Sequence, residues 1–541
     1  MSRSMSIAGV LVLALNWACL AKDEPVTKPS TAPSTQPRMK ISLDLDKALN
    51  VAMPKIEKDL TATDFKTPDG KGGWAIRIPG GRPIATPAFF EGMLFVGGGY
   101  GSHEFYAFDA ASGKVVWQIK TADDGPTAAV VEDGYVAFNT ESCTVIVVDA
   151  RTGKLIWQEW LGDPLMSQPA ISKGRLYIAY PGANPRGVQS GDKVKAGDAA
   201  PPATGALINA AQNAAAQQQV MPGGVPATKP GGNTVGPAKG MGHRLLCADL
   251  KTGTHIWEQD ITAEVITAPV VDGDQVFFTC FDGTSFCVKA DNGQVVWKKE
   301  HSGQTAPLLV AGNAIIQQKV ALANADVAEG MVFFSLKSGA AAASTQPVAL
   351  GKADYYKPGA SGNVTLSTTQ QAAFDASVGF AGGAPAMAQM GKAMTNSNIG
   401  TVAGAWAYQG SRAAYNDGRL MQGQANRLNC VLADGSVFAW QAEATGKGID
   451  GSSQIFCPPA LGKKNMYVCS ARGELLSMDQ KEGSLNFAYA LKVPIAFQPA
   501  LAGGNMYAGT ADGLLICLKT GDKDADGWFA WGGNAQHNKK E

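Results

Sequence analysis

The chain lacks several features that would identify a chemistry. It has only five histidines and nine cysteines among 541 residues, and no two histidines have a recognised metal-binding spacing. A Gly-x-Ser-x-Gly turn, a phosphate-binding glycine loop and a Cys-x-x-Cys-His sequence are also missing. The motifs of a serine hydrolase, a nucleotide-binding loop and a covalently attached haem are therefore excluded, and no catalytic residue is assigned.

Excess charge and long apolar runs are absent as well. Lys plus Arg equal Asp plus Glu at 46 each, so the chain has no net field to attract nucleic acid or an anionic membrane surface. After the N-terminal segment, no stretch offers 18 uninterrupted apolar residues. Nucleic-acid binding and a transmembrane span in the mature chain are not expected.

Residues 1–21 have the pattern of a secretory signal peptide, with the apolar run Ile7–Leu15 followed by small residues. This predicts an exported protein, periplasmic or extracellular. Cys19 suggests lipid anchoring, but Asn16 and Trp17 are poor residues before a lipidated cysteine. Lipidation at Cys19 is therefore disfavoured, while peripheral membrane association stays open.

Composition divides the remaining chain. Residues 22–72 form a predicted linker and N-terminal extension, because Pro25–Pro37 is rich in Pro, Ser and Thr. Residues 73–541 form the predicted folded domain. Two segments inside it, at about 181–240 and 341–400, are rich in Ala, Gly, Gln and Pro and have few large apolar groups. They are predicted insertions, because they cannot bury much surface.

An internal repeat dominates this domain. Four copies share an x-Asp-x-x-x-Gly-x-x-x-Trp spacing, with Lys289 replacing Asp in the fourth, and a fifth copy has Phe in place of Trp. The repeated positions are Asp109, Gly113, Trp117, Asp149, Gly153, Trp157, Asp249, Gly253, Trp257, Gly293, Trp297, Asp479, Gly483 and Phe487. Constant spacing with drifting side chains indicates a repeated backbone unit and not a repeated active site.

Each unit contains four short apolar runs separated by turn residues. Trp157 lies 40 residues after Trp117, and Trp297 lies 40 residues after Trp257. This period is typical of four-stranded propeller blades, and a ring of such blades leaves only short protected edges. The predicted fold class is all-β, a β-propeller of four-stranded antiparallel blades.

The spacings also predict the number of blades. Trp257 lies 100 residues after Trp157, which is one period plus an insertion of 60. Two diverged units and the second insertion fit between Trp297 and Phe487, which gives eight units in all. Seven blades are the alternative, because residues 321–426 are poorly patterned. Either the strand at Gly73–Pro79, which contains Trp74, or a C-terminal strand at Trp528 closes the ring.

These repeats resemble the tryptophan-docking repeats of the pyrroloquinoline quinone (PQQ)-like β-propeller superfamily. The resemblance covers about 74–320 and 427–519, and the segment Trp528–His537 is similar to one that often borders such propellers. It implies that the outer Trp packs against the neighbouring blade, while the Asp and Gly shape the turn between the third and fourth strands.

The resemblance includes enzymes and non-enzymes. PQQ-dependent dehydrogenases use eight-bladed propellers of this kind, with calcium beside the quinone, and many alcohol dehydrogenases carry two adjacent cysteines. This chain has no Cys-Cys pair, and no segment matches the calcium ligands, so no cofactor is predicted. The BamB-like branch, which assists outer-membrane β-barrel assembly, shares the blade count and export.

The favoured hypothesis is a non-catalytic interaction or assembly scaffold with envelope proteins as partners, acting as a monomer. A PQQ- and calcium-dependent dehydrogenase is one alternative. A carbohydrate- or peptide-binding propeller, with the insertions as lids, is another, because loops on a rigid scaffold often carry function.

Two further patterns concern thiols and calcium. Eight cysteines follow the signal segment, and three share one repeat position with Ala, Val and Ser, so free structural thiols are expected. A bridge between Cys457 and Cys469 is the alternative.

Asp at alternate positions followed by Gly resembles the first half of a calcium loop, but the Glu expected at position twelve is missing. The weak calcium candidate comprises Asp522, Asp524 and Asp526.

Overall fold

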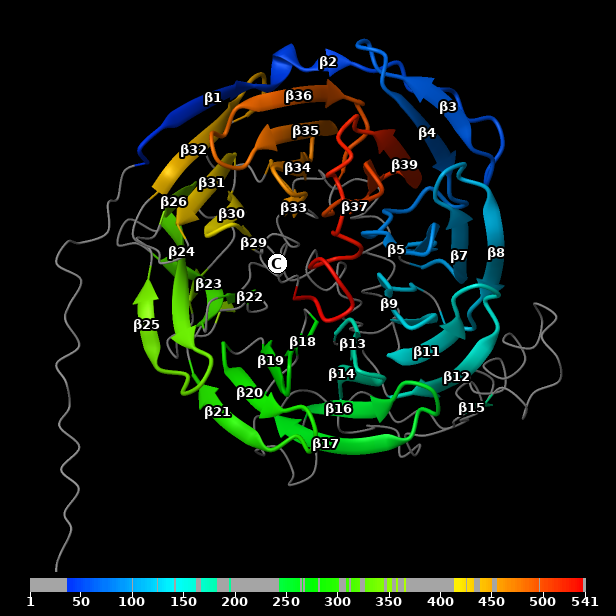
Figure 1. Ribbon diagram of the computed structural model, residues 1–541, viewed down its shortest axis with the longest axis vertical. Helices are drawn as coiled ribbons and strands as arrows, with labels where there is room; N and C mark the ends of the chain where they lie inside the picture. The colour runs from blue at the N-terminus through cyan, green and yellow to red at the C-terminus, as the bar shows by residue number, and fades with distance from the viewer. Residues whose placement is uncertain are drawn as a thin grey trace, which may run out of the picture.

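A computed structural model describes residues 37–181, 243–344 and 413–538, with short gaps inside each range, and a few strand residues between these ranges. The described chain is almost entirely β-structure, and its sheets stand side by side around a central axis (Figure 1). The described strands form eight sheets of four or five main strands and one two-stranded sheet. The predicted all-β propeller of four-stranded antiparallel blades is confirmed.

Blades 1 to 4 follow one another along the chain. Blade 1 contains β5 (Ala88–Phe90), β6 (Met93–Gly97), β7 (Glu104–Asp109) and β8 (Val115–Lys120). Blade 2 contains β9 (Val130–Glu132), β10 (Tyr135–Asn139), β11 (Thr144–Asp149) and β12 (Leu155–Trp160), with β15 (Val194–Lys195) at its edge. Blade 3 contains β13 (Ala170–Ser172), β14 (Arg175–Pro181), β16 (His243–Asp249) and β17 (His255–Ile261). Blade 4 contains β18 (Val270–Asp272), β19 (Gln275–Thr279), β20 (Ser285–Lys289) and β21 (Val295–Lys299).

Blades 5 to 8 complete the ring. Blade 5 contains β22 (Leu308–Val310), β23 (Asn313–Ala321), β24 (Asp326–Ser335) and β25 (Ala341–Ser344), with β26 (Val348–Lys352) also paired to β24. Blade 6 contains β29 (Ala414–Asn416), β30 (Arg419–Gln424), β31 (Arg427–Leu432) and β32 (Phe438–Thr445). Blade 7 contains β33 (Ala460–Leu461), β34 (Asn465–Cys469), β35 (Glu474–Asp479) and β36 (Leu485–Ala490). Blade 8 contains β37 (Ala500–Ala502), β38 (Asn505–Gly509), β39 (Leu514–Lys519) and β4 (Gly72–Arg77). The two-stranded sheet pairs β27 (Lys357–Pro358) with β28 (Val364–Thr365).

The middle strands of a blade are apolar on both faces. In β11, the four consecutive residues from Val145 to Val148 are all buried, because each sheet packs between two neighbouring blades. Strands covered on both faces show continuous apolar runs and not an alternation with polar residues. The core is therefore divided into layers between blades, which explains the short β-branched and aromatic runs of every unit.

The Asp and Gly of the repeat build the turn between the third and fourth strands. The Oδ1 atom of Asp149 accepts hydrogen bonds from the backbone N–H and the hydroxyl of Thr152 at 2.9 and 2.7 Å. Gly153 has φ +67° and donates its N–H to the Asp149 carbonyl at 2.8 Å. A side chain is strained at this φ, so Gly is the favoured residue. The expected turn role of the repeat is confirmed at this position.

The Trp of each unit docks on the next blade. Trp117 Nε1 donates to the Ala150 carbonyl at 2.9 Å, and Trp157 Nε1 donates to the Leu250 carbonyl at 2.7 Å. Trp257, Trp297 and Trp440 make the same bond to the next blade. In each case the acceptor is the residue after the last position of the third strand. The docking role that the resemblance implies is therefore observed in the structure.

The repeat Gly makes room for the docked ring. A Cβ atom built on Gly153 would lie 2.7 Å from Cδ2 of Trp117, and one on Gly253 would lie 2.8 Å from Cδ2 of Trp157. Such distances are shorter than real Cβ contacts. The Gly is thus required twice, first by its positive φ and then by the Trp of the preceding blade.

The N-terminal strand closes the ring. β4 pairs antiparallel with β39, with Trp74 opposite Cys517. Trp74 then packs on Gly113 of blade 1, where a Cβ would lie 3.0 Å from its Cδ2. Trp528 forms only an isolated bridge with Leu501. Of the two predicted closures, the strand within Gly73–Pro79 is the correct one.

The way in which the ring closes also explains why Phe487 occupies the Trp position of the repeat in blade 7. Blade 8 takes its fourth strand from the N-terminal part of the chain, so it has no turn between β39 and a following strand. The hairpin between β3 (Thr63–Lys66) and β4 lies there instead, and Lys71 Nζ is 5.3 Å from the centroid of the Phe487 ring. The partner surface of Phe487 therefore differs from the one that Trp117 or Trp257 meets.

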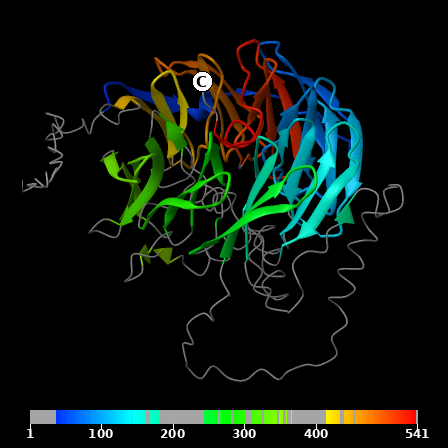
Figure 2. The same ribbon diagram turned by 60° about the horizontal axis from the view of Figure 1, so that its bottom comes forward.

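Residues 40–66 form a strap around the outside of three blades. β1 (Lys40–Asp44) pairs parallel with β32, and β2 (Leu49–Asn50) pairs parallel with β36. Between them lies the 3₁₀ helix η1 (Leu45–Lys47), and β3 then pairs with β4. Figure 2 shows these blue strands following the outer rim. The predicted N-terminal extension within 22–72 thus contains three edge strands.

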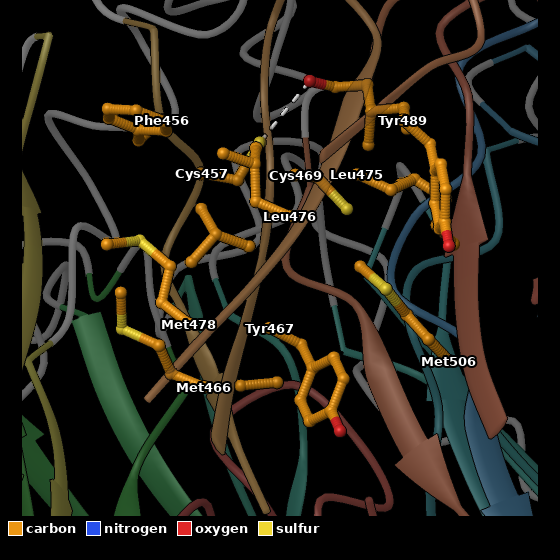
Figure 3. Close-up of a cluster of buried hydrophobic side chains, with 14 of the residues drawn as sticks. Phe456, Cys457, Met466, Tyr467, Cys469, Leu475, Leu476, Met478, Tyr489 and Met506 are labelled. Carbon is orange, nitrogen blue, oxygen red and sulfur yellow. Dashed lines mark hydrogen bonds between the residues drawn. The ribbon is translucent and has the colours of Figure 1, made fainter. Parts of the chain in front are cut away.

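The largest core layer lies between blades 6, 7 and 8. It contains Met466, Met478, Met506, Cys457 and Cys469 (Figure 3). Flexible thioethers fill irregular gaps between sheets. The thiol of Cys457 donates to the Ile495 carbonyl at 3.3 Å.

Several predicted segments lie outside the described residues. These are the signal peptide at 1–21, Cys19, Pro25 to Gln36 of the linker and most of both insertions. The predicted second insertion begins too early at 341, because β25 and β26 belong to blade 5.

We expect Trp257→Ala to lower the free energy of unfolding by roughly 3–5 kcal/mol, because it removes a large buried ring between two blades. Trp117→Ala should have a similar effect. Val116→Ala is the matched control, since Val116 is 47% exposed on the same strand and should change stability by less than about 0.5 kcal/mol. Chemical denaturation of the three variants measures the difference. Equal stability of the Trp variants and the control would contradict the docking role.

Gly153→Ala should destabilise by roughly 2–4 kcal/mol, since the new methyl group meets Trp117 and the backbone keeps a positive φ. Gly134→Ala is the comparison, because Gly134 has φ +81° but no heavy atom within 4 Å of the added Cβ. Its cost should be only the backbone strain, about 1–2 kcal/mol. A Gly134 variant that is as unstable as the Gly153 variant would show that contact with Trp117 contributes nothing.

Candidate functional site on the turn face

One end of the ring, here called the turn face, carries the turns that join the first two and the last two strands of each blade. In blade 1 these turns are adjacent, because Ala110 N–H donates to the Gly92 carbonyl at 2.8 Å. The C-terminal tail, residues 522–538, lies across this face, where it appears as the red segment near the middle of the ring (Figure 1).

The tail binds the innermost strands of four blades through its carbonyl groups. Leu501 N–H donates to Trp528, and Phe89 N–H donates to Phe529, both at 2.7 Å. Ile171 N–H then donates to Ala535 at 2.8 Å, and Val271 N–H donates to Gln536 at 3.1 Å. Each donor is the middle residue of a three-residue strand. The tail thus extends across blades 8, 1, 3 and 4.

Side chains reinforce this path. Gln498 Oε1 accepts from Gly532 N–H at 3.0 Å, while its Nε2 donates to the Pro459 carbonyl at 2.7 Å. Gln536 Nε2 donates to Glu132 Oε1 of blade 2 at 2.8 Å. Phe529 stacks on Phe89, with 5.7 Å between ring centroids. The tail is therefore an integral part of the turn face.

His537 is the buried titratable group of the tail, with 2% of its surface exposed. Its Nδ1 atom lies 2.6 Å from the Trp531 carbonyl oxygen, and its Nε2 atom lies 2.9 Å from the Pro169 carbonyl oxygen. The imidazole also packs edge-on against the Trp531 ring, with 5.2 Å between centroids. One side chain therefore joins the end of the chain to blade 3.

The three aspartates of the calcium candidate do not converge. Asp522 Oδ2 accepts from Asn465 Nδ2 and from the Tyr467 hydroxyl, both at 2.8 Å. Asp526 Oδ1 instead accepts from Gly503 N–H at 3.0 Å. Within the described residues, no three His, Cys, Asp or Glu side chains are placed to hold a metal ion. Asp522 and Asp526 thus fasten the tail to blades 7 and 8, and calcium binding at these residues stays a prediction.

Burial raises the pKa of Asp522, but the hydrogen bonds from Asn465, Tyr467 and the Asp524 backbone outweigh it, and the pKa is lowered overall. A carboxylate that accepts several hydrogen bonds stays ionised. Asp522 therefore contributes as an anion that positions the start of the tail.

A second charged cluster holds the strap. Arg472 lies between two carboxylates, 2.9 Å from Asp46 Oδ1 on η1 and 3.1 Å from Glu474 Oε1. Asp46 Oδ2 also accepts from Lys447 N–H at 2.8 Å. Burial raises the pKa of Glu474, which also contacts the Ser470 hydroxyl. The cluster connects the strap to the hairpin between β34 and β35.

A third cluster joins blades 2 and 3. The two ring nitrogens of His255 face carboxylates, with Nε2 3.0 Å from Glu159 Oε2 and Nδ1 2.9 Å from Glu258 Oε1. Arg244 contacts Glu258 at 2.9 Å as well. Glu159 is buried, and this contact gives its Oε2 atom a polar partner. The cluster is a contact between blades 2 and 3.

Eight cysteines lie in the described part of the chain, and all are buried thiols outside any disulfide. Burial raises the pKa of Cys247, Cys287, Cys430 and Cys517 to about 12. It also raises the pKa of Cys457 and Cys469. Cys457 N–H donates to the Cys469 carbonyl at 3.0 Å, so the two are neighbours, but both are free thiols. The predicted free thiols are confirmed, and the alternative bridge between Cys457 and Cys469 is wrong.

No helix in the described part of the chain has the length and apolar character needed to cross a membrane. The turn and docking residues of the repeat are engaged in contacts within and between blades, as Asp149, Gly153 and Trp157 show. The described residues thus make structural contacts, and the tail crosses one end of the ring. The arrangement of blades and tail holds the surface loops of the ring in fixed positions.

The sequence motifs located the turn and docking residues but missed His537, Gln498 and Arg472. Their partners are far away in sequence: Pro169 for His537, Pro459 for Gln498 and Asp46 for Arg472. The resemblance of Trp528–His537 to a bordering segment was the one signal that indicated the tail.

Thiol titration should find no rapidly reacting cysteine in the native mature protein and eight reactive thiols after unfolding without reductant. The reason is that the thiolate is the reactive form, and burial disfavours it in all six cysteines whose pKa is raised. A coloured thiol reagent, added before and after denaturant, measures both values. Fewer than eight thiols after unfolding would indicate a disulfide and contradict the free state.

The chain is similar in sequence to two outer membrane protein assembly factors. It is 20% identical over 244 residues to the outer membrane protein assembly factor BamB of Nitrosomonas eutropha, covering 42% of this chain and 54% of that protein. It is 22% identical over 221 residues to the factor of the same name from Yersinia pestis, covering 39% and 53%. The chain thus spans about half the length of the curated relatives it matches.

Two solved structures align with low sequence identity. BamB from Moraxella catarrhalis aligns with 11% identity and a TM-score of 0.45, covering 82% of this chain and 96% of that chain. A quinohemoprotein alcohol dehydrogenase from Comamonas testosteroni aligns with 10% identity and a TM-score of 0.47, covering 83% and 76%.

The family model PQQ_2, described as outer membrane protein assembly factor BamB, matches residues 58–194 and 190–379. These two matches together span more than half of the 541 residues. They include blades 1 to 4 and the docking residues Trp117, Trp157 and Trp257. The chain therefore belongs to the BamB-like family of PQQ-type β-propellers.

Proposed function

We propose that this protein is a non-catalytic scaffold that binds other envelope proteins and assists the assembly of outer-membrane proteins. Family membership carries the proposal, since the curated relatives are named for that assembly role. The geometry supports it, because the repeat residues serve inter-blade docking and the ring presents a rigid surface. A fold alone does not determine a function, so the proposal depends on the family match.

The proposal also specifies where the protein acts and its oligomeric state. The protein is exported to the periplasm, where its signal-like N-terminus would direct it, and it acts as a monomer. Its partners are proteins of the envelope. A ring of eight sheets suits a scaffold. Its loops and strand edges can vary to bind partners, while the contacts between blades keep the ring intact.

Loss of the gene should lower the amounts of folded outer-membrane β-barrel proteins in the source cell, and the wild-type chain should restore them. Quantitative proteomics of the membrane fraction, with heat-modifiable mobility of the barrels, measures the effect. A chain carrying Val116→Ala should complement fully, whereas Trp257→Ala should complement poorly in proportion to its lower stability. Unchanged barrel levels in the deletion strain would contradict the assembly role.

A direct binding measurement separates this proposal from the quinone alternative. The purified mature chain is titrated with PQQ and calcium, and absorbance and dye-linked oxidation of alcohols or aldoses are followed. The scaffold proposal expects neither tight binding nor turnover. Tight binding with turnover would overturn it and make the ring an enzyme.

A further inference from the structure

The contact between blades 5 and 6, here called the 5–6 joint, lacks the aromatic residue that docks at the other joints of the ring. In blade 5, Phe333 of β24 pairs with Ala343 of β25. This is the register at which Cys287 pairs with Trp297 in blade 4, so Ala343 occupies the docking position. Alanine has neither a ring nor a side-chain N–H. The 5–6 joint therefore forms without the bond that Trp297 makes from blade 4 to blade 5.

The residue that would receive a docking ring has changed as well. Ser436 follows the end of β31 at Leu432 by four residues, so it takes the sequence position of the repeat Gly. In blade 7 that position is Gly483, and a Cβ built on it would lie 2.9 Å from Cδ2 of Trp440. Both members of the docking contact are thus replaced at the 5–6 joint, so its geometry is not set by a Trp on a Gly.

The face of blade 6 that meets blade 5 is partly polar. Leu420 and Val431 identify this face, because they pack in one layer with Phe333 of β24. Gln422 and Asn429 lie two residues further along the same two strands and pair with each other across β30 and β31. Residues two apart in a strand share a face. Both amides are buried, so the layer between blades 5 and 6 changes from apolar groups to amides.

The corresponding residues of other blades are apolar. In blade 2 they are Phe138 and Ile146, and in blade 4 they are Phe278 and Phe286, which stack with 5.0 Å between ring centroids. The amide nitrogen of Gln422 has no hydrogen-bond partner among the described residues. A buried amide donor without a partner destabilises the closed joint, and contact with water relieves this when the joint parts.

The strap and the tail tie other blades together. The strap strands β1, β2 and β3 extend the sheets of blades 6, 7 and 8. The tail bonds to blades 8, 1, 3 and 4 through its backbone and to blade 2 through Gln536. In the described part of the chain, blade 5 lies outside both sets, between blades 4 and 6 (Figure 1). Blades 6 and 5 are thus the two ends of the series that strap, tail and docked rings hold together.

We propose that the 5–6 joint opens and closes reversibly in the folded protein, while the other joints stay closed. Burial of Phe333, Leu420 and Val431 favours the closed state. Opening brings the amides of Gln422 and Asn429 into contact with water. Such local opening needs less free energy than unfolding of the whole ring. It is a property of the ring, and it holds whether or not the protein binds envelope proteins.

The joint at which the two chain ends meet is better held. Trp74 on β4 packs against Gly113 of blade 1, and β3 of the strap extends the sheet of blade 8. The tail then crosses this joint, from its bond with Leu501 of blade 8 to its bond with Phe89 of blade 1. The joint that opens is therefore not the one that joins the ends of the chain.

Site-resolved thiol labelling of the full mature chain under native conditions tests the opening. Val431→Cys and Val148→Cys are a matched pair, because each valine is buried and is the second-last residue of the third strand of its blade. Val431 packs at the 5–6 joint, whereas Val148 packs at the joint that Trp117 holds. Peptide mass spectrometry measures each rate, which is divided by the rate in denaturant. The thiol at position 431 should react about 100-fold faster than the thiol at position 148, the order of effect expected for one missing buried ring.

Restoring the docking pair should reverse this effect. In the Val431→Cys chain, Ala343→Trp together with Ser436→Gly should slow labelling at position 431 about tenfold or more. Ala343→Trp alone should slow it less, because the Ser436 side chain takes the space that a Gly leaves for a ring. Labelling of native Cys287, which lies in the layer between blades 4 and 5, should be the same in all variants.

Equal rates at positions 431 and 148 would overturn the proposal. A rate at position 431 equal to those of native Cys287 and Cys430 would also overturn it, since this would indicate unfolding of the whole ring. If Val431→Cys folds poorly, Gln422→Cys replaces it, because the Gln422 amide nitrogen has no hydrogen bond to lose among the described residues. Its thiol should react faster than Cys287 and Cys430 of the same chain, and equal rates would again contradict the opening.

Discussion

The contact between one tryptophan and the next blade is the constraint on which the rest of the ring depends. A single four-stranded sheet that is apolar on both faces cannot be stable alone, because both faces need cover. The Trp117 bond to Ala150 and its contact with Gly153 fix the rotation and distance between two such sheets. Repetition of this contact with the same geometry produces a curved series of blades. The conformational requirement of the Asp–Gly turn is therefore linked to the shape of the whole molecule.

Much of this architecture was predictable because its determinants are local and repeated. The turn residues and the docking Trp lie within ten residues of one another, so a single unit contains the whole signal. The blade boundaries, the two diverged blades between Trp297 and Phe487, and the free cysteines at a repeat position shared with Ala, Val and Ser all followed from alignment of the units. The closing strand was one of two candidates, since the pairing of β4 with β39 joins residues more than 430 positions apart. Sequence periodicity carries no information about such a pairing.

The strap and the tail were harder to predict from the sequence, for a different reason. β1 and β2 are short edge strands with partly exposed side chains, so neither hydrophobic alternation nor length distinguishes them from a linker. In the tail, the spacing of the acids in residues 522–526 resembles that of a calcium loop. Their actual partners, Asn465, Tyr467 and the Gly503 backbone, come from blades 7 and 8. His537 had no sequence signal, because the chemistry of an imidazole between two carbonyls exists only in the folded chain.

The use of both chain ends in blade 8 also determines the order in which the molecule can fold. β4 has no sheet to join until β39 is in place, so residues 72–77 can pair only after blade 8 has begun to form. The strap has the same dependence, since β1 and β2 add to β32 and β36. Before these strands pair, the blades can form only an open arc with two exposed edges, and the last pairings convert it to a closed ring. A cell that makes this protein must keep the arc from pairing with other chains until the last blade is complete.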